Sequence, residues 1–244
     1  MYSNIKRIYT QHSLNSDNHI TLTSSQIHYL KNVLRIKIND YIRIFNGIDG
    51  EWLAKVKTVK KKDIDFILEK KIKDQNNSSK IDIFFALIKK DRINILVQKC
   101  TELGIKNFFP IKSERTNIKN LNINSLQQNA IEASQQSERM DIPKIETPKS
   151  LEECINSLDK NYCLIFCDEK KNGNDNIIDT MKKINNKFDK WVLLIGPEGG
   201  FSDNDRNKIL NFKNTYSVSL GKRILRSDTA ATAALFCMEK YINY

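Results

Sequence analysis

The stretch Leu194-Ile195-Gly196-Pro197-Glu198-Gly199-Gly200-Phe201-Ser202 carries the strongest indication of the fold. It follows an apolar run typical of a buried strand and precedes a pattern typical of a helix over 203–212. Ser202 and Asp205 are spaced as in a capping box, which explains how that helix begins but leaves Pro-Glu-Gly-Gly unexplained. Ligands of open α/β sheets bind at the carboxyl ends of strands, where glycine lets the backbone approach closely. We therefore predict a ligand-binding loop here.

A second stretch of this kind is Leu220-Gly221-Lys222-Arg223-Ile224-Leu225-Arg226-Ser227-Asp228-Thr229-Ala230-Ala231. It follows a predicted strand, 217–220, and leads into a predicted helix, 229–241, whose alanines allow close packing. Asp228 is placed to cap that helix. Three basic side chains within five positions at a helix start suit a site that handles an anionic polymer.

Strands and helices alternate from residue 81 to the end of the chain. The predicted strands are 81–87, 107–111, 163–167, 191–195 and 217–220, and the predicted helices are 92–103, 126–137, 177–184, 203–212 and 229–241. This alternation predicts an α/β fold, with a mostly parallel sheet covered by helices on both faces.

The N-terminal part has a different pattern. Short strands are predicted over 41–45, 52–56 and 64–68, with Asn-Gly and Asp-Gly turns, and one helix over 24–34. Strands this short predict a compact barrel or curled sheet. The polar segment 74–80 has no apolar side chain to bury and is predicted to be a linker. We expect two domains, 1–73 and 74–244.

The charge of the chain is unevenly distributed. Of 244 residues, 40 are Lys or Arg and 29 are Asp or Glu, a formal net charge of +11. Lysine, asparagine and isoleucine are all abundant, as in proteins of AT-rich genomes, so the total alone says little about function. Residues 1–73, however, carry a net charge of +7, and residues 74–244 only +4. A small basic domain beside a nearly balanced larger one predicts a platform that binds a polyanion such as RNA.

Several common kinds of site are missing from the sequence. It has no GxGxxG, P-loop, HExxH or GxSxG motif, and its three histidines all lie within residues 1–73. The five cysteines predict reduced thiols, with neither a disulfide framework nor a metal site. No run approaches the roughly 20 apolar residues of a bilayer-spanning helix, and the start lacks a signal-peptide pattern. We expect a cytoplasmic protein that uses no metal.

Together with other motifs, the two stretches resemble the RsmE family, the bacterial 16S rRNA uracil-N3 methyltransferases of the SPOUT class. The resemblance covers nearly the whole chain, through 28–35 (HYLKNVLR), 86–92 (ALIKKDR), 98–104 (QKCTELG), 113–115 (SER) and 132–137 (EASQQS). The chain departs from the family at Asp205 and Asp228, where Glu is more frequent, and at Lys222, which replaces a frequent Pro.

The resemblance implies a trefoil-knotted SPOUT methyltransferase domain preceded by a small β-rich PUA-like barrel, and a homodimer whose active site uses both subunits. It also implies S-adenosyl-L-methionine in a pocket of three loops, 166–169, 195–199 and 220–229. The expected cofactor-binding residues are Ile195, Gly196, Pro197, Glu198, Gly199, Leu220, Gly221, Ile224, Leu225, Arg226, Thr229 and Ala230.

The implied reaction needs assistance at the base, because uracil N3 carries a proton and is then a poor nucleophile. A cation could stabilise the anion that develops on O2 or O4. Arg226 is the preferred cation, with Arg115 or Arg139 as candidates from elsewhere in the dimer. Asp228 and Glu198 are the carboxylates nearest the loops, and each could instead cap a helix or brace a loop. We expect Arg226, Asp228 and Arg115 to be catalytic.

The expected substrate is 16S rRNA, within the small ribosomal subunit, lying across the basic domain. Candidate phosphate contacts are Arg7, Lys31, Arg35, Lys37, Arg43, Lys89, Arg92 and Arg139. Two alternatives stay open: a SPOUT methyltransferase acting on another RNA, and a non-enzymatic RNA-binding factor in ribosome assembly. The two loop motifs favour an enzyme over the second alternative.

Overall fold

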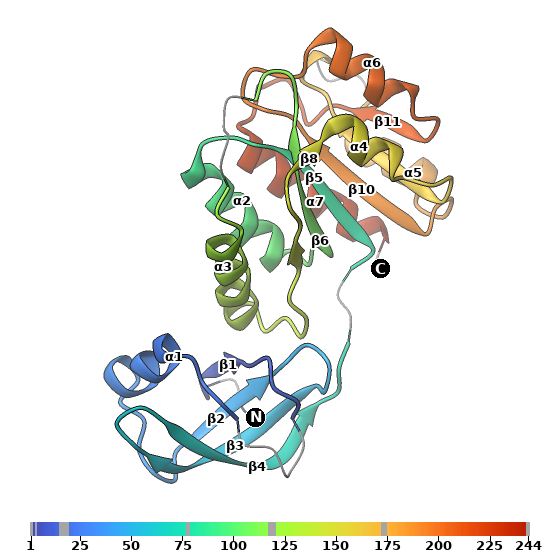
Figure 1. Ribbon diagram of the computed structural model, residues 1–244. Helices are drawn as coiled ribbons and strands as arrows, with labels where there is room; N and C mark the ends of the chain where they lie inside the picture. The colour runs from blue at the N-terminus through green and yellow to red at the C-terminus, as the bar shows by residue number, and fades with distance from the viewer. Residues whose placement is uncertain are drawn as a thin grey trace. The chain divides into compact units, whose positions relative to one another are not determined.

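A computed structural model describes residues 2, 4–14, 20–76, 79–116, 121–171 and 175–242. The chain divides into two compact units, each with its own sheet (Figure 1). The first unit contains residues 1–77 and 134–142, and the second contains residues 78–133 and 143–244. The predicted linker 74–80 spans the first boundary, and its residues 77 and 78 lie outside the described ones. No local pattern marks 134–142 as part of the first unit.

The first unit is built on a four-stranded sheet. In sheet order its strands are β1 (Arg7–Tyr9), β2 (Tyr41–Phe45), β3 (Glu51–Val59) and β4 (Ile64–Lys73). β1 pairs with β2 in parallel, and the other pairs are antiparallel. The strands predicted over 41–45, 52–56 and 64–68 are present, the last two longer than expected. β1, with three residues, is too short to give a sequence pattern.

One helical segment covers this sheet. α1 (Ser24–His28) begins with a capping box between Thr23 and Gln26 and continues into η1 (Tyr29–Val33), a π-helical turn. The prediction of one helix over 24–34 is right in place, although the winding changes after His28. Leu30 packs from this segment into the core of the unit, with Ile8, Ile42, Ile44 and Val56.

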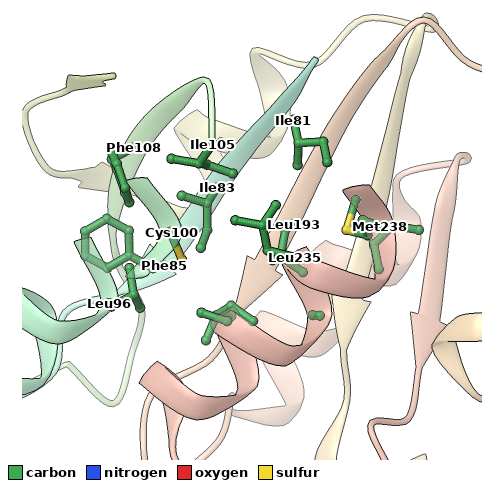
Figure 2. Packing of buried hydrophobic residues seen from close by; sticks show 14 of the residues in the cluster. Ile81, Ile83, Phe85, Leu96, Cys100, Ile105, Phe108, Leu193, Leu235 and Met238 are labelled. Carbon is green, nitrogen blue, oxygen red and sulfur yellow. The ribbon is translucent and has the colours of Figure 1, made fainter. Parts of the chain in front are cut away.

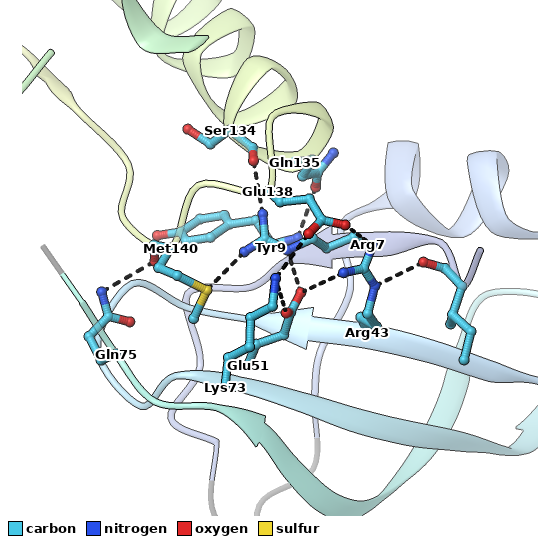
Figure 3. Close-up of polar contacts among 11 residues, drawn as sticks. Arg7, Tyr9, Arg43, Glu51, Lys73, Gln75, Ser134, Gln135, Glu138 and Met140 are labelled. Carbon is cyan, nitrogen blue, oxygen red and sulfur yellow. Dashed lines mark hydrogen bonds and ion pairs between the residues drawn. The ribbon is translucent and has the colours of Figure 1, made fainter. Parts of the chain in front are cut away.

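A network of charged side chains, buried at Arg7, Arg43 and Glu51 and partly exposed at Lys73 and Glu138, fastens segment 134–142 to the sheet (Figure 3). Glu51, fully buried, accepts a hydrogen bond from Arg7, and Arg7 Nη1 donates to the Ser134 carbonyl at 2.8 Å. Glu138 accepts from Arg43 at 2.8 Å and from Lys73 at 2.9 Å. Each end of the network thus joins a strand residue to 134–142.

The second unit contains a seven-stranded sheet. In order, its strands are β11 (Thr215–Val218), β9 (Tyr162–Cys167), β10 (Lys190–Ile195), β5 (Ile81–Ala86), β6 (Asn107–Lys112) and β7 (Lys144–Ile145), while β8 (Lys149–Ser150) also pairs with β6. Every recorded pairing of these strands is parallel. The predicted α/β fold with a parallel sheet is confirmed.

Helices cover both faces of this sheet, as predicted. On one face, Ile83, Phe85 and Leu193 pack with α2 (Lys90–Glu102) and α7 (Ser227–Ile242), as Figure 2 shows, and α3 (Ile123–Gln136) and α5 (Ile177–Ile184) join the same cluster. On the other face, alternate strand residues such as Phe84 and Val192 pack with α4 (Leu151–Asn156) and α6 (Asp203–Asn211). Because both faces are buried, the two central strands are apolar over 83–86 and 191–195.

Sequence reasoning missed four short elements of this unit: α4, β7, β8 and the 3-10 turn η2 (Glu169–Lys171). The start of α4 did carry a signal, because Ser150 and Glu153 form a capping box.

Within the part of the chain that the structure describes, no helix is both long and apolar enough to cross a membrane.

The charged network predicts how stability depends on pH. Hydrogen bonds from Arg43 and Lys73 lower the pKa of Glu138 from its ordinary 4.5 to about 2. A carboxyl with a lowered folded-state pKa stabilises the fold above its unfolded-state pKa, and this contribution disappears as the pH falls through the folded value. We expect Glu138→Gln to lower the free energy of unfolding at pH 7 by about 0.5–1 kcal/mol. The effect is this small because Glu138 and Lys73 are partly exposed. The loss should shrink between pH 5 and about pH 2, as measured by urea unfolding.

The control for this experiment is Glu69→Gln, at an exposed position of β4. It should follow the wild-type protein at every pH. A constant difference between Glu138→Gln and wild type from pH 7 to pH 2 would contradict the assigned ionisation.

Candidate active site

A pocket of about 260 Å³ lies at the carboxyl ends of β9, β10 and β11. These strands are neighbours and run in parallel, so the loops that follow them meet at one edge of the sheet. The pocket is lined by residues 167–169, 195–198, 200 and 219–225, together with Ser227 and Ala230 of α7. The three loops expected to form one site therefore do lie together.

Nine of the twelve expected cofactor-binding residues line this pocket: Ile195, Gly196, Pro197, Glu198, Leu220, Gly221, Ile224, Leu225 and Ala230. Gly199, Arg226 and Thr229 are not among its lining residues. The wall also contains residues that were not named individually. Those inside the expected loops are Cys167, Asp168, Glu169, Lys222, Arg223 and Ser227, and those directly beside the loops are Gly200 and Ser219.

Asp168 holds the end of β9 in place. Its buried carboxylate accepts from Arg206 Nη1 and Nη2 at 2.7 and 2.8 Å, from Ser217 Oγ at 2.8 Å and from the Lys170 amide at 2.9 Å. Burial alone would raise the pKa of Asp168, but these hydrogen bonds outweigh it and lower the pKa. Asp168 thereby links the end of β9 to α6 and β11 at the pocket wall.

Gly200 explains why a glycine is needed in the loop after β10. Its φ is +67°, and its amide donates to the Pro197 carbonyl at 2.9 Å. A Cβ at this position would lie 2.4 Å from Glu169 Oε1, in the pocket wall. A Cβ on Gly199 would meet no atom within 4 Å. Within the protein, the close approach is therefore at Gly200, next to the expected cofactor-binding residue Gly199.

The loop after β6 braces this glycine-containing loop from outside the pocket. Arg115 Nη1 donates to the Gly199 carbonyl at 2.7 Å, and the Glu114 amide donates to Asp205 Oδ2 at 3.0 Å. Ser202 caps α6, accepting from the Asp205 amide at 3.0 Å. The Asp205 carboxylate thus binds Glu114 rather than completing the expected capping box. Arg115, a catalytic candidate, is in this structure a brace within its own chain.

Arg226 and Asp228 differ sharply in their surroundings. The side chain of Arg226 is exposed and has no hydrogen bond or ion pair with any described residue. Asp228 is buried and pairs with Arg92, Nη1 to Oδ2, at 3.1 Å. The expectation that Asp228 caps the last helix is wrong, because α7 begins at Ser227 and places Asp228 inside its first turn.

The candidate RNA-binding residues fall into two groups. Arg7, Arg43 and Arg139 are buried, and each forms an ion pair, Arg139 with Asp141 at 2.8 Å. Their guanidinium groups are used inside the first unit, which corrects the expectation that they face phosphate and that Arg139 serves as a catalytic cation. Of the remaining candidates, three are exposed: Arg35, Lys37 and Lys89. Lys31 is half-buried, and its ammonium donates to the Lys60 carbonyl. Arg92 is half-buried and forms an ion pair.

The described residues contain no group of three or more His, Cys, Asp or Glu side chains placed to hold a metal ion. All five cysteines are free, and burial raises the pKa of Cys154 to about 11, so this thiol stays protonated near neutral pH.

Comparison with known proteins identifies the family. Residues 75–239 match the family described as RNA methyltransferase domain, and residues 22–69 match the family described as RNA methyltransferase PUA domain. Ribosomal RNA small subunit methyltransferase E of Rickettsia conorii is 33% identical over 94% of this chain and 93% of its own length. The protein of the same name from Buchnera aphidicola subsp. Schizaphis graminum is 30% identical over 98% and 97%.

Solved structures share the fold over nearly the full length. The enzyme of that name from Neisseria gonorrhoeae, solved with S-adenosyl methionine, has a TM-score of 0.87 and 24% identity, with 98% of each chain covered. A putative methyltransferase from Legionella pneumophila, also with bound S-adenosyl methionine, has a TM-score of 0.82 and 25% identity over 97% of this chain and 98% of its own. On the matched domains and these full-length relatives, the chain belongs to the RsmE family of ribosomal RNA small subunit methyltransferases.

Proposed function

We propose that this protein transfers a methyl group from S-adenosyl-L-methionine to N3 of a uridine in 16S rRNA. The observation that carries the proposal is the pocket at the carboxyl ends of β9, β10 and β11, whose wall contains residues of both family motifs. The names of the full-length relatives support small-subunit rRNA as the substrate. The choice of N3 rests on the family resemblance.

The residues of the pocket suit this cofactor. Ile195, Leu220 and Leu225 offer apolar surface to an adenine ring, and Glu169 and Glu198 bring negative charge to a pocket for a cationic ligand. Glycines at 196, 200 and 221 expose backbone groups that can read the base edge. The cofactor supplies an electrophilic methyl group on a sulfonium, so no metal is needed to activate it.

The task of the protein is to hold uracil in line and to make N3 nucleophilic. Orientation supplies much of the rate in such a transfer. As N3 loses its proton, negative charge spreads to O2 and O4, where a cation stabilises it. We assign this role to Arg226, because its side chain is exposed and has no partner among the described residues, and because its neighbours Leu225 and Ser227 line the pocket.

The RNA is proposed to contact the exposed cations that remain after the buried arginines are set aside. Arg35 and Lys37 follow η1 in the first unit, and Lys89 precedes α2 in the second. Lys31 is held at the surface by hydrogen bonds to the Lys60 and Lys61 carbonyls. Such contacts bind phosphates without reading sequence, so the target base must be selected at the pocket, after it leaves its stack.

A homodimer in the cytoplasm, where ribosomal subunits are assembled, completes the proposal. Helices α2 and α7 pack together, and they expose Ile95 and Phe236, apolar side chains of the kind that a second copy would bury.

The direct test of the proposed function is incubation of the protein with small subunits or 16S rRNA and S-adenosyl-L-methionine, followed by mass spectrometry of the nucleosides. N3-methyluridine is expected, and methylation confined to tRNA or large-subunit rRNA would move the protein to another substrate.

Cofactor binding should depend on Gly200. Gly200→Ala places a Cβ against Glu169 in the pocket wall and forces an L side chain into the left-handed region, at a cost of about 1–2 kcal/mol. We expect the Kd for S-adenosyl-L-methionine to rise about tenfold, measured by calorimetry. Gly199→Ala, whose Cβ enters open space, is the matched control and should bind as wild type does. Equal affinity in the two variants would contradict this pocket assignment.

Arg226 should act on the chemical step. Loss of one preorganised charge-stabilising group typically costs 100-fold to 1000-fold in rate, so Arg226→Ala should lower kcat by about that factor and leave the cofactor Kd nearly unchanged. Arg226→Lys should recover only part, because a point charge does not reproduce the planar donor fork. Single-turnover methylation at saturating cofactor and RNA measures this, and wild-type chemistry in Arg226→Ala would remove it from the mechanism.

RNA affinity should fall steeply with salt concentration. Because each neutralised phosphate releases counterions, Arg35→Gln with Lys37→Gln should reduce the slope of log K against log salt by about 2. Lys183→Gln on α5, an exposed lysine of the second unit, is the control and should leave the slope unchanged. Filter binding of 16S rRNA between 50 and 200 mM salt measures the slope, and an unaltered slope in the double variant would exclude these contacts.

A further inference from the structure

Arg92 and Asp228 form an ion pair that joins the first turns of two helices. Arg92 Nη1, from α2, lies 3.1 Å from Asp228 Oδ2, in α7. The Asp228 side chain is 7% exposed and that of Arg92 is 32% exposed. The start of a helix favours a carboxylate, because its free amides carry partial positive charge. Arg92 adds a full charge from the neighbouring helix.

Asp228 depends on Arg92 for its charge partner. Among the described residues, no other side chain donates to this carboxylate, and its second oxygen, Oδ1, is buried with no hydrogen-bond partner. A buried carboxylate is costly unless it is paired and hydrogen-bonded. Removal of Arg92 would therefore leave a buried charge uncompensated and disturb the turn that carries it.

That turn carries two parts of the candidate active site. Ser227 and Ala230 line the pocket, and Ser227 Oγ donates to the Gly196 carbonyl at 2.8 Å. The Ala230 amide donates to the Arg226 carbonyl at 2.7 Å, which fixes the backbone of Arg226 to the turn. A displacement of this turn would move the pocket wall and Arg226 together.

We propose that Arg92 is a positioning residue for the methyl transfer: through Asp228 it holds the first turn of α7, and with it Arg226 and the pocket wall formed by Ser227 and Ala230. The inference rests on the proposed function, since the role of Arg226 comes from it. It gives Arg92 a task other than the expected phosphate contact. It also gives Asp228 a task that does not require this carboxylate to take a proton from uracil.

The test compares Arg92→Gln and Arg92→Lys with Lys99→Gln. Lys99 lies on the same helix and pairs at the surface with Glu102, so Lys99→Gln removes one charge from α2 without touching α7. Small misplacements of catalytic groups cost up to about 100-fold, so we expect Arg92→Gln to slow single-turnover methylation about 10-fold to 100-fold at saturating cofactor and RNA. Arg92→Lys should recover part of the rate, and Lys99→Gln should retain wild-type rate.

A salt titration separates positioning from phosphate binding. If Arg92 contacts phosphate, Arg92→Gln raises the KM for RNA, lowers the slope of log K against log salt by about 1 and leaves kcat unchanged. That result would overturn the proposal. Positioning predicts an unchanged slope and a lowered kcat.

Hydrogen exchange tests the inference without any activity. Amides of residues 226–231 should exchange faster in Arg92→Gln than in wild type or Lys99→Gln. If the wild-type protein methylates no small-subunit rRNA, the proposed function fails, and this measurement still decides whether Arg92 orders the turn. Unchanged exchange would reject the inference. Should Arg92→Gln fail to fold, the double variant with Asp228→Asn, which removes the uncompensated charge, undergoes the same comparison.

Discussion

Parallel pairing of β9, β10 and β11 is the constraint on which the rest of the second unit depends. Residues 162–166 pair with 190–194, and residues 164–167 pair with 215–218, so three chain segments end at one edge of the sheet. A slip of one residue would exchange the side chains on the two buried faces, so the register is strongly fixed. The loops that leave this edge meet at the pocket, and their glycines and small side chains form part of its wall.

Much of this architecture could be predicted because it depends on patterns of residues that are close together in the sequence. Apolar runs mark the central strands, and turn residues separate them, so the alternation of strands and helices followed from the residues alone. The meeting of the three loops in one pocket was implied by the family resemblance. The exact glycine did not follow, because it depends on which Cβ would strike Glu169, a residue 31 positions earlier in the chain. Asp228 was misread for a similar reason. Its partner, Arg92, lies 136 positions away, and a sequence pattern cannot distinguish a capping carboxylate from a paired one.

The buried arginines show why counting charge overestimates a nucleic-acid surface. Arg7 and Arg43 contribute to the excess positive charge of residues 1–73, yet both are used inside the unit, against Glu51 and Glu138. Arg7 also lies over the ring of Phe45, 3.6 Å from its centroid. Arginine suits such places because its planar group can stack and donate several hydrogen bonds at once. The lysines carry no comparable burial and account for most of the open positive surface.

The membership of residues 134–142 in the first unit has a consequence during synthesis. Arg7 donates a hydrogen bond to the Ser134 carbonyl, 127 positions later in the chain. When residue 77 has been synthesised, segment 134–142 does not yet exist, so the first unit is still without the segment that packs on its sheet. At about 5–20 residues per second, translation from residue 77 to residue 142 takes roughly 3–13 s. Throughout that interval Arg7, Arg43 and Glu51 lack the segment that covers them, while the second unit is still emerging. The nascent chain therefore passes through a stage in which the first unit is incomplete.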